Sequence, residues 1–260
     1  MRGAATTVRA RGTTLAAVTA AGVLLLAGCG GTGGGTGTAG AKGSAGHPSV
    51  GGGAAAKASP GATPTPGRTL PGVGPTMSAQ VPAAARQAIV VYGASPTTSR
   101  STVALFTRTG DGIWQPGPTW PSHNAIHGWT PQHHEDDLRS PIGVFTLHDA
   151  GGLLADPGAR LPYHRSTAFT TPASWPKSYQ HDFDYVIAID YNRVVGTSPA
   201  DPTRPRGESK GGGIWLHLDH GVGTSACVTV SKDAMRYLLR TLTPADHPVI
   251  VMGDRAHLAG

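Results

Sequence analysis

Short apolar runs separated by glycine, proline and aspartate dominate the chain from about residue 83 to residue 255. They are rich in β-branched and aromatic residues, which is typical of strands bounded by turns. The runs fall at residues 87–92, 102–107, 142–147, 183–191 and 249–252. Asp111 and Gly112 favour a hairpin after the second run. The pattern predicts a mainly β domain, in which the proline-rich stretch 150–182 forms surface loop.

One segment near the C-terminus has helical instead of strand periodicity. Ser231 is a suitable N-cap, and Pro244 fits the end of the segment. The apolar residues between them recur at positions i, i+3, i+4 and i+7, namely Met235, Leu238, Leu239 and Leu242. This spacing predicts a helix with a single apolar stripe.

Alternation at residues 213–218 predicts a further strand that begins at the last of three glycines. Ile214, Leu216 and Leu218 would share one face of this strand, and Trp215 and His217 would share the other. We therefore expect His217 to face away from the aliphatic core.

The N-terminal 28 residues have the layout of a secretion signal. Basic residues precede an apolar run at 15–26, and Leu-Ala-Gly then leads into Cys29. This ending resembles the lipobox of bacterial lipoproteins, in which the cysteine is lipidated. It implies a signal peptide at residues 1–28 and a lipid on Cys29 that holds the protein at the extracytoplasmic face of the cell membrane.

Composition divides the remaining chain. Residues 29–82 are mainly glycine, alanine, serine, threonine and proline, so we expect a disordered tether. A folded domain at 83–255 and a short tail at 256–260 follow. The formal charge of +6 includes arginines of the signal peptide, and no basic run suggests nucleic acid as a partner. We expect a monomer.

The two cysteines make Cys227 the centre of the chemical interpretation. If Cys29 is acylated, Cys227 has no disulfide partner outside the cell, and it is either an inert buried residue or a reactive thiol. His217 lies ten residues upstream, across a loop that contains Gly221 and Gly223. Such a loop can fold back and bring an imidazole base to the thiol, which needs one to become a nucleophile.

Several neighbours of Cys227 are candidates for supporting roles. The backbone N–H groups of Ser225, Ala226 and Cys227 can form an oxyanion hole. Trp215 and Thr224 can line the cleft, and His220 is an alternative base.

The twelve histidines of the chain also suggest a metal site, above all His123, His127, His133 and His134. Their segment has the proline and glycine content of a loop, so we expect neither a metal site nor a cofactor.

The same motif resembles the catalytic motif of the L,D-transpeptidase (YkuD-type) family, a strand histidine followed by a loop and Ser/Thr-His-Gly-Cys. His217 matches the strand histidine, and residues 224–227 match the second half, with Ser225 and Ala226 in place of histidine and glycine and with a shorter loop. Residues 137–145 are similar to the family's TP-x-G-x-F segment, and Tyr191-Asn192 to a common strand end. The resemblance covers residues 87–253.

The resemblance implies a family β-sandwich with a helix after the cysteine, and an enzyme acting on peptidoglycan stem peptides. Cys227 would attack the carbonyl of an L,D bond, release D-alanine and form a thioester, with His217 as the base. An amine would resolve the thioester as a cross-link, or water would trim the peptide; both remain open. Two other hypotheses also remain open: a non-catalytic wall-binding lipoprotein and a histidine-rich metal-binding lipoprotein.

Overall fold

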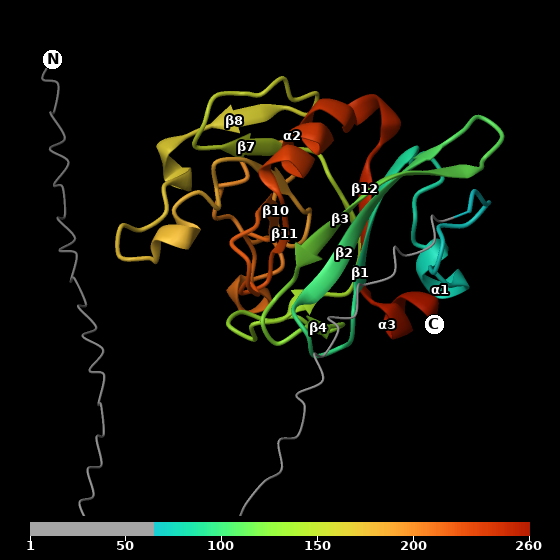
Figure 1. The fold of residues 1–260 in the computed structure, drawn as a ribbon, viewed down its shortest axis with the longest axis horizontal. Helices are drawn as coiled ribbons and strands as arrows, with labels where there is room; N and C mark the ends of the chain where they lie inside the picture. The colour runs from blue at the N-terminus through green and yellow to red at the C-terminus, as the bar shows by residue number, and fades with distance from the viewer. Residues whose placement is uncertain (1–64) are drawn as a thin grey trace, which may run out of the picture. The chain divides into compact units, whose positions relative to one another are not determined.

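The apolar strand segments pair into two five-stranded sheets in the computed structural model, which describes residues 65–260 (Figure 1). The first sheet has the order β3-β2-β1-β12-β6. The central pair, β1 and β12, is parallel, and the other neighbours are antiparallel. Its strands are β1 (Gln87–Gly93), β2 (Arg100–Arg108), β3 (Trp114–His123), β6 (Gly143–Thr146) and β12 (Val249–Asp254).

The second sheet has the order β11-β10-β9-β7-β8, and β4 and β5 form a separate two-stranded pair that contacts β12 of the first sheet. Most of these strands are short, but β10 and β11 lie parallel and adjacent, which decides the position of Cys227. The bounds are β4 (Trp129–Thr130), β5 (Ser140–Pro141), β7 (Ala150–Gly152), β8 (Tyr163–Arg165), β9 (Val186–Ala188), β10 (Trp215–Leu218) and β11 (Val228–Val230).

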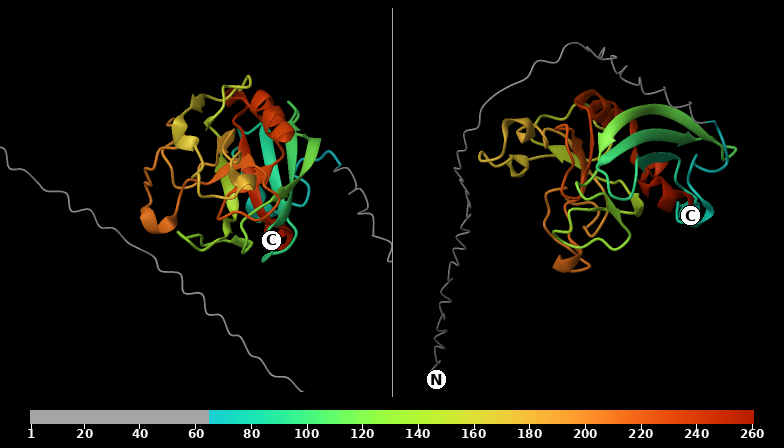
Figure 2. Two further views of the ribbon diagram at one scale, coloured as in Figure 1. Left: turned by 60° about the vertical axis from the view of Figure 1, so that its left-hand side comes forward. Right: turned by 60° about the horizontal axis from the view of Figure 1, so that its bottom comes forward.

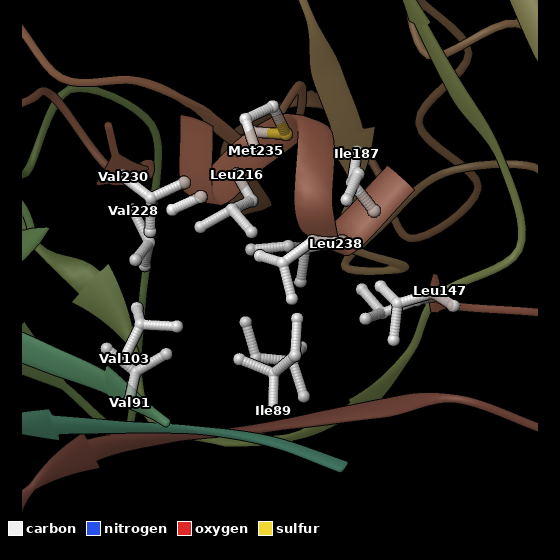
Figure 3. Packing of buried hydrophobic residues seen from close by; sticks show 14 of the residues in the cluster. Ile89, Val91, Val103, Leu147, Ile187, Leu216, Val228, Val230, Met235 and Leu238 are labelled. Carbon is white, nitrogen blue, oxygen red and sulfur yellow. The ribbon is translucent and has the colours of Figure 1, made fainter. Parts of the chain in front are cut away.

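The main core fills the space between the two sheets and the helix α2 (Lys232–Thr241). Figure 3 shows side chains of the first sheet facing those of the second sheet and of α2. The contributors from the first sheet include Ile89, Val91 and Val103, and those opposite include Leu216, Val228, Met235 and Leu238, all fully buried. The prediction of a mainly β, sandwich-like fold with a helix after Cys227 is confirmed.

The helix α2 begins where the sequence predicts it. Ser231 has extended backbone angles, and its hydroxyl oxygen accepts a hydrogen bond from the Ala234 N–H at 3.3 Å. Asp233 lies in the first turn and Arg240 in the last, which complements the helix dipole. The apolar stripe of α2 is buried in the main core, and α2 contacts β10, the strand that carries His217.

We expect the substitution Ser231→Ala to lower the free energy of unfolding by about 1 kcal/mol, since it leaves an N-terminal amide of α2 without its capping oxygen. Urea denaturation followed by circular dichroism measures the change. Ser231→Asp retains a capping oxygen and should restore most of the stability. Equal losses in both variants would contradict a capping role.

The folded region extends beyond the predicted bounds of 83–255 at both ends. The helices α1 (Pro75–Ser78) and α3 (Arg255–Ala259) pack beside the first sheet, and Gly74 N–H donates to the Leu258 carbonyl at 2.7 Å. Leu70, Val73 and Met77 are buried in a second apolar cluster. Glycine and proline dominate the composition there and hide these few anchoring side chains.

The stretch 150–182 also differs from its prediction as loop, since it contains β7, β8 and two short 3₁₀ segments at Thr167–Phe169 and Lys177–Tyr179. Two others lie at Glu208–Lys210 and Pro244–Asp246. In Figures 1 and 2 this stretch lies away from the C-terminus. Conversely, the predicted strand at 183–191 is regular only over β9.

The predicted signal peptide, the lipidation site Cys29 and most of the predicted tether lie outside the described residues. Over residues 65–260, no helix has the length and apolar character needed to cross a bilayer.

Candidate active site

Cys227 immediately precedes β11, and the parallel register with β10 decides what lies beside it. Leu216 is opposite Val228, so Cys227 lies beside Trp215 at the start of β10. The Trp215 N–H donates to the Cys227 sulfur at 3.3 Å, and the thiol donates to the Gly213 carbonyl at 3.7 Å. The thiol is thus held at the start of β10, in a partly buried residue.

His217 lies two residues further along β10 and is buried, with 3% of its surface exposed. Its Nδ1 is 2.9 Å from the carbonyl oxygen of Leu218, the next residue of the same strand. A carbonyl only accepts hydrogen bonds, so Nδ1 carries the proton and Nε2 keeps a free lone pair. This arrangement prepares His217 to accept a proton through Nε2.

A single cavity of about 400 Å³ is lined by both Cys227 and His217. Its lining combines aromatic and aliphatic side chains with polar ones. The other lining residues are Ile126, Leu138, Trp175, Tyr179, Asp182, Phe183, His220, Gly223, Thr224 and Ser225. Among residues 65–260, no hydrogen bond joins the thiol to an imidazole; its partners are the Trp215 N–H and the Gly213 carbonyl.

Burial holds both groups neutral. It raises the pKa of the Cys227 thiol to about 11, and the nearby Asp182 carboxylate acts in the same direction. Burial also lowers the pKa of His217 to about 4. The charged form of each group is disfavoured because it loses water. At neutral pH the free protein therefore contains a thiol beside a neutral imidazole, which has the lone pair that a general base requires.

The raised thiol pKa predicts slow alkylation of Cys227 in the folded chain. A rise of two pKa units reduces the thiolate fraction at pH 8 about 100-fold. We expect the rate of iodoacetamide labelling at Cys227, followed by peptide mass spectrometry, to rise about tenfold per pH unit from pH 7 to 10. The denatured chain should level off near pH 9. Faster labelling of the folded chain at pH 8 would contradict a neutral resting thiol.

The turn before Cys227 presents backbone N–H groups that have no hydrogen-bond partner within residues 65–260, those of Ser225, Ala226 and Cys227. Two hydroxyl groups hold the carbonyls of this turn. Ser140 donates to the Ala226 carbonyl at 2.7 Å, and Thr224 donates to the Cys227 carbonyl at 2.7 Å. Because a trans peptide directs its N–H opposite to its C=O, the Cys227 N–H points away from Ser140.

The remaining predicted site residues have distinct environments. Trp215 packs edge to face against Phe169 and Phe183, and its indole N–H donates to the Pro199 carbonyl, so it lines a separate cavity of about 180 Å³. Thr224 is buried and acts through its hydroxyl. His220 lines the main cavity.

Two site residues escape the sequence interpretation. Asp182 lines the cavity and lies 2.9 Å from His220 Nδ1, and burial raises its pKa to about 6. It falls at the end of the stretch predicted as loop, where sequence alone gives an aspartate no special meaning. Ser140 lies within the TP-x-G-x-F-like segment, but its contact with the Ala226 carbonyl depends on the tertiary fold.

The histidines considered for a metal site do not gather together. His123 pairs with Asp219 at 2.8 Å, His127 is exposed, and His133 forms a buried pair with Asp137 at 2.9 Å. His134 is exposed.

A smaller cavity of about 120 Å³ is also lined by Cys227, and it includes neither His217 nor His220. Glu135 and Asp136 line it, Glu135 is paired with Arg204 at 3.0 Å, and Leu138 lines both cavities. Asp136 and Leu138 have left-handed backbone angles, with φ of 62° and 55°. Such a conformation is costly for these residues and is maintained by their surroundings.

No protein-family model matches this chain, and no curated protein matches it. Among solved structures it is similar to the helical cell shape determining protein Pgp2 from Campylobacter jejuni, with a TM-score of 0.37 and 14% sequence identity. The match covers 65% of this chain and 48% of Pgp2, so the chain spans about half the length of that protein. The function therefore has to be inferred from the residues of the site.

Proposed function

We propose that the chain is a cysteine acyltransferase of the L,D-transpeptidase type that acts on peptidoglycan stem peptides. The observation that carries the proposal is one cavity lined by both Cys227 and His217, next to three backbone N–H groups that have no hydrogen-bond partner within residues 65–260. A nucleophile, a base and oxyanion donors are the groups that acyl transfer requires. The motif resemblance supplies the substrate class.

In the first half-reaction, His217 Nε2 takes the thiol proton while the Cys227 sulfur bonds to the carbonyl carbon of the L,D bond. The Cys227 N–H and its neighbours donate to the developing oxyanion. The tetrahedral intermediate collapses, the C–N bond breaks, and His217 returns the proton to the departing amine of D-alanine. A thioester remains on Cys227.

In the second half-reaction, an amine of a second stem attacks the thioester, loses its proton to His217 and forms the cross-link, and the proton returns to the thiolate. Water in place of the amine gives a trimmed peptide. The smaller cavity beside Cys227 supports the amine, because the Asp136 carboxylate would attract an ammonium group, whereas Glu135 is already paired with Arg204. We therefore favour cross-linking over trimming.

The decisive experiment incubates the purified chain with disaccharide tetrapeptide and follows D-alanine and the peptide products by mass spectrometry. We expect D-alanine release, a thioester adduct on the peptide that contains Cys227, and cross-linked dimer as the larger product. A chain that forms no adduct and releases no D-alanine would leave a non-catalytic wall-binding lipoprotein as the better interpretation.

The proposal includes export and lipid anchoring through Cys29, which rest on the N-terminal sequence alone. We expect palmitate labelling of the full chain in a bacterial host, and loss of both the label and membrane recovery in Cys29→Ala. If the Cys29→Ala protein still incorporates palmitate, Cys29 is not the lipidation site.

A further inference from the structure

The cavity beside Cys227 brings together three side chains that can bind metal ions. Asp182, His217 and His220 each offer one ligand atom, and these atoms all lie within 4.8 Å of one another. Within the described residues, no other group of three such side chains is gathered in this way. Two imidazoles and a carboxylate form one of the common ligand sets of zinc in proteins.

His220 provides an independent indication of a ligand. Its side chain is only 2% exposed and stacks on Tyr179 at a centroid distance of 4.1 Å. Its Nδ1 lies 2.9 Å from an Asp182 oxygen, but neither ring nitrogen makes a well-aligned hydrogen bond within residues 65–260. Buried imidazole nitrogens are usually satisfied, and an unsatisfied ring facing a cavity points to a bound partner.

The surroundings of His217 and Asp182 also favour binding of a metal cation. The Nδ1–H of His217 is bound to the Leu218 carbonyl, the contact that fixes metal-binding imidazoles and leaves Nε2 as the ligand. Asp182 is buried with 4% of its side chain exposed, and the cost of its negative charge would be offset by a cation.

We propose that Asp182, His217 and His220 bind one zinc ion, with the fourth coordination position open toward the cavity and Cys227. Two zinc bonds of about 2.1 Å span at most about 4.2 Å, so the three ligand atoms need only small side-chain rotations to close on the ion. Borderline-soft zinc fits this nitrogen and oxygen set better than calcium or magnesium, which take oxygen ligands.

Zinc at this position would bind the Nε2 lone pair of His217, which then could not accept the proton of the Cys227 thiol. The bound ion therefore inhibits the reaction of Cys227 reversibly, a consequence that rests on the proposed function. Zinc binding does not rest on the proposed function, because it depends only on Asp182, His217 and His220.

The test uses the full chain stripped with a chelator and dialysed against zinc chloride, with the bound metal measured by atomic emission. We expect one tight equivalent. Asp182→Asn and His220→Ala should each weaken binding at least about tenfold. His148→Ala is the matched control, since His148 pairs with Asp190 at 2.6 Å outside the cavity, and this variant should bind like the unsubstituted chain.

Less than one equivalent of zinc, or unchanged binding in both ligand variants, would overturn the site. Circular dichroism checks that the variants fold. A further measurement uses the unsubstituted chain with cobalt in place of zinc and so does not depend on the folding of a variant. We expect the intense absorption bands of tetrahedral cobalt. A weak octahedral spectrum would contradict the site. A chain that binds zinc as expected but never releases D-alanine overturns the proposed function alone, whereas an active chain that zinc does not inhibit overturns the inhibition.

Discussion

Replacing Cys227 by serine should reduce D-alanine release by on the order of 10³-fold or more, because the alcohol is a far poorer nucleophile than the sulfur in this pocket. The serine hydroxyl can accept from the Trp215 N–H and donate to the Gly213 carbonyl, as the thiol does. The fold and the cavity should therefore survive. Steady-state kinetics and the loss of the thioester adduct measure the effect.

Ser225→Ala is the matched control for this prediction. Ser225 is an exposed residue of the same turn, and its expected contribution is a backbone N–H that alanine retains. We expect its turnover to stay within about threefold of the unsubstituted chain, since no reacting group is removed. Retained D-alanine release in Cys227→Ser would place the chemistry at another residue.

The sequence predicts the central part of the site because local patterns position it. Alternation puts His217 on β10, the glycine loop returns the chain, and a capped helix begins soon after Cys227. These features lie within about 20 consecutive residues, so strand and helix periodicity suffices to bring them together. Cys227 and His217 line one cavity, and their catalytic roles stay a prediction.

The rest of the site depends on contacts between distant segments, which periodicity does not encode. Ser140 reaches the Ala226 carbonyl across 86 residues of sequence, and Asp182 approaches His220 from a stretch with no regular pattern. The partner of His217 Nδ1 is the Leu218 carbonyl, a contact that only the backbone geometry of β10 reveals. The sequence does not reveal that Leu70, Val73 and Met77 are buried, because three apolar residues are too few to stand out in a segment rich in glycine and proline.

Replacing His217 by glutamine should lower the rate of thioester formation by about 10²- to 10⁴-fold, the usual contribution of a general base. Glutamine occupies similar space but cannot take up the thiol proton. The matched variant is His220→Gln, which alters the same cavity and should cost less than about tenfold. Single-turnover measurement of the adduct on Cys227 separates this step from later resolution of the thioester.

Comparing His217→Gln with His220→Gln shows which of the two imidazoles is the base, a choice that the sequence leaves open. His217 is tethered to a carbonyl that keeps its Nε2 lone pair available, whereas His220 lies against the Asp182 carboxylate. A carboxylate partner stabilises a charged imidazole, so His220 with Asp182 would be the base if the larger loss occurred in His220→Gln. That outcome would reassign the base to the Asp182–His220 pair and leave Cys227 as the nucleophile. Equal, small losses in both variants would instead indicate that neither imidazole removes the thiol proton.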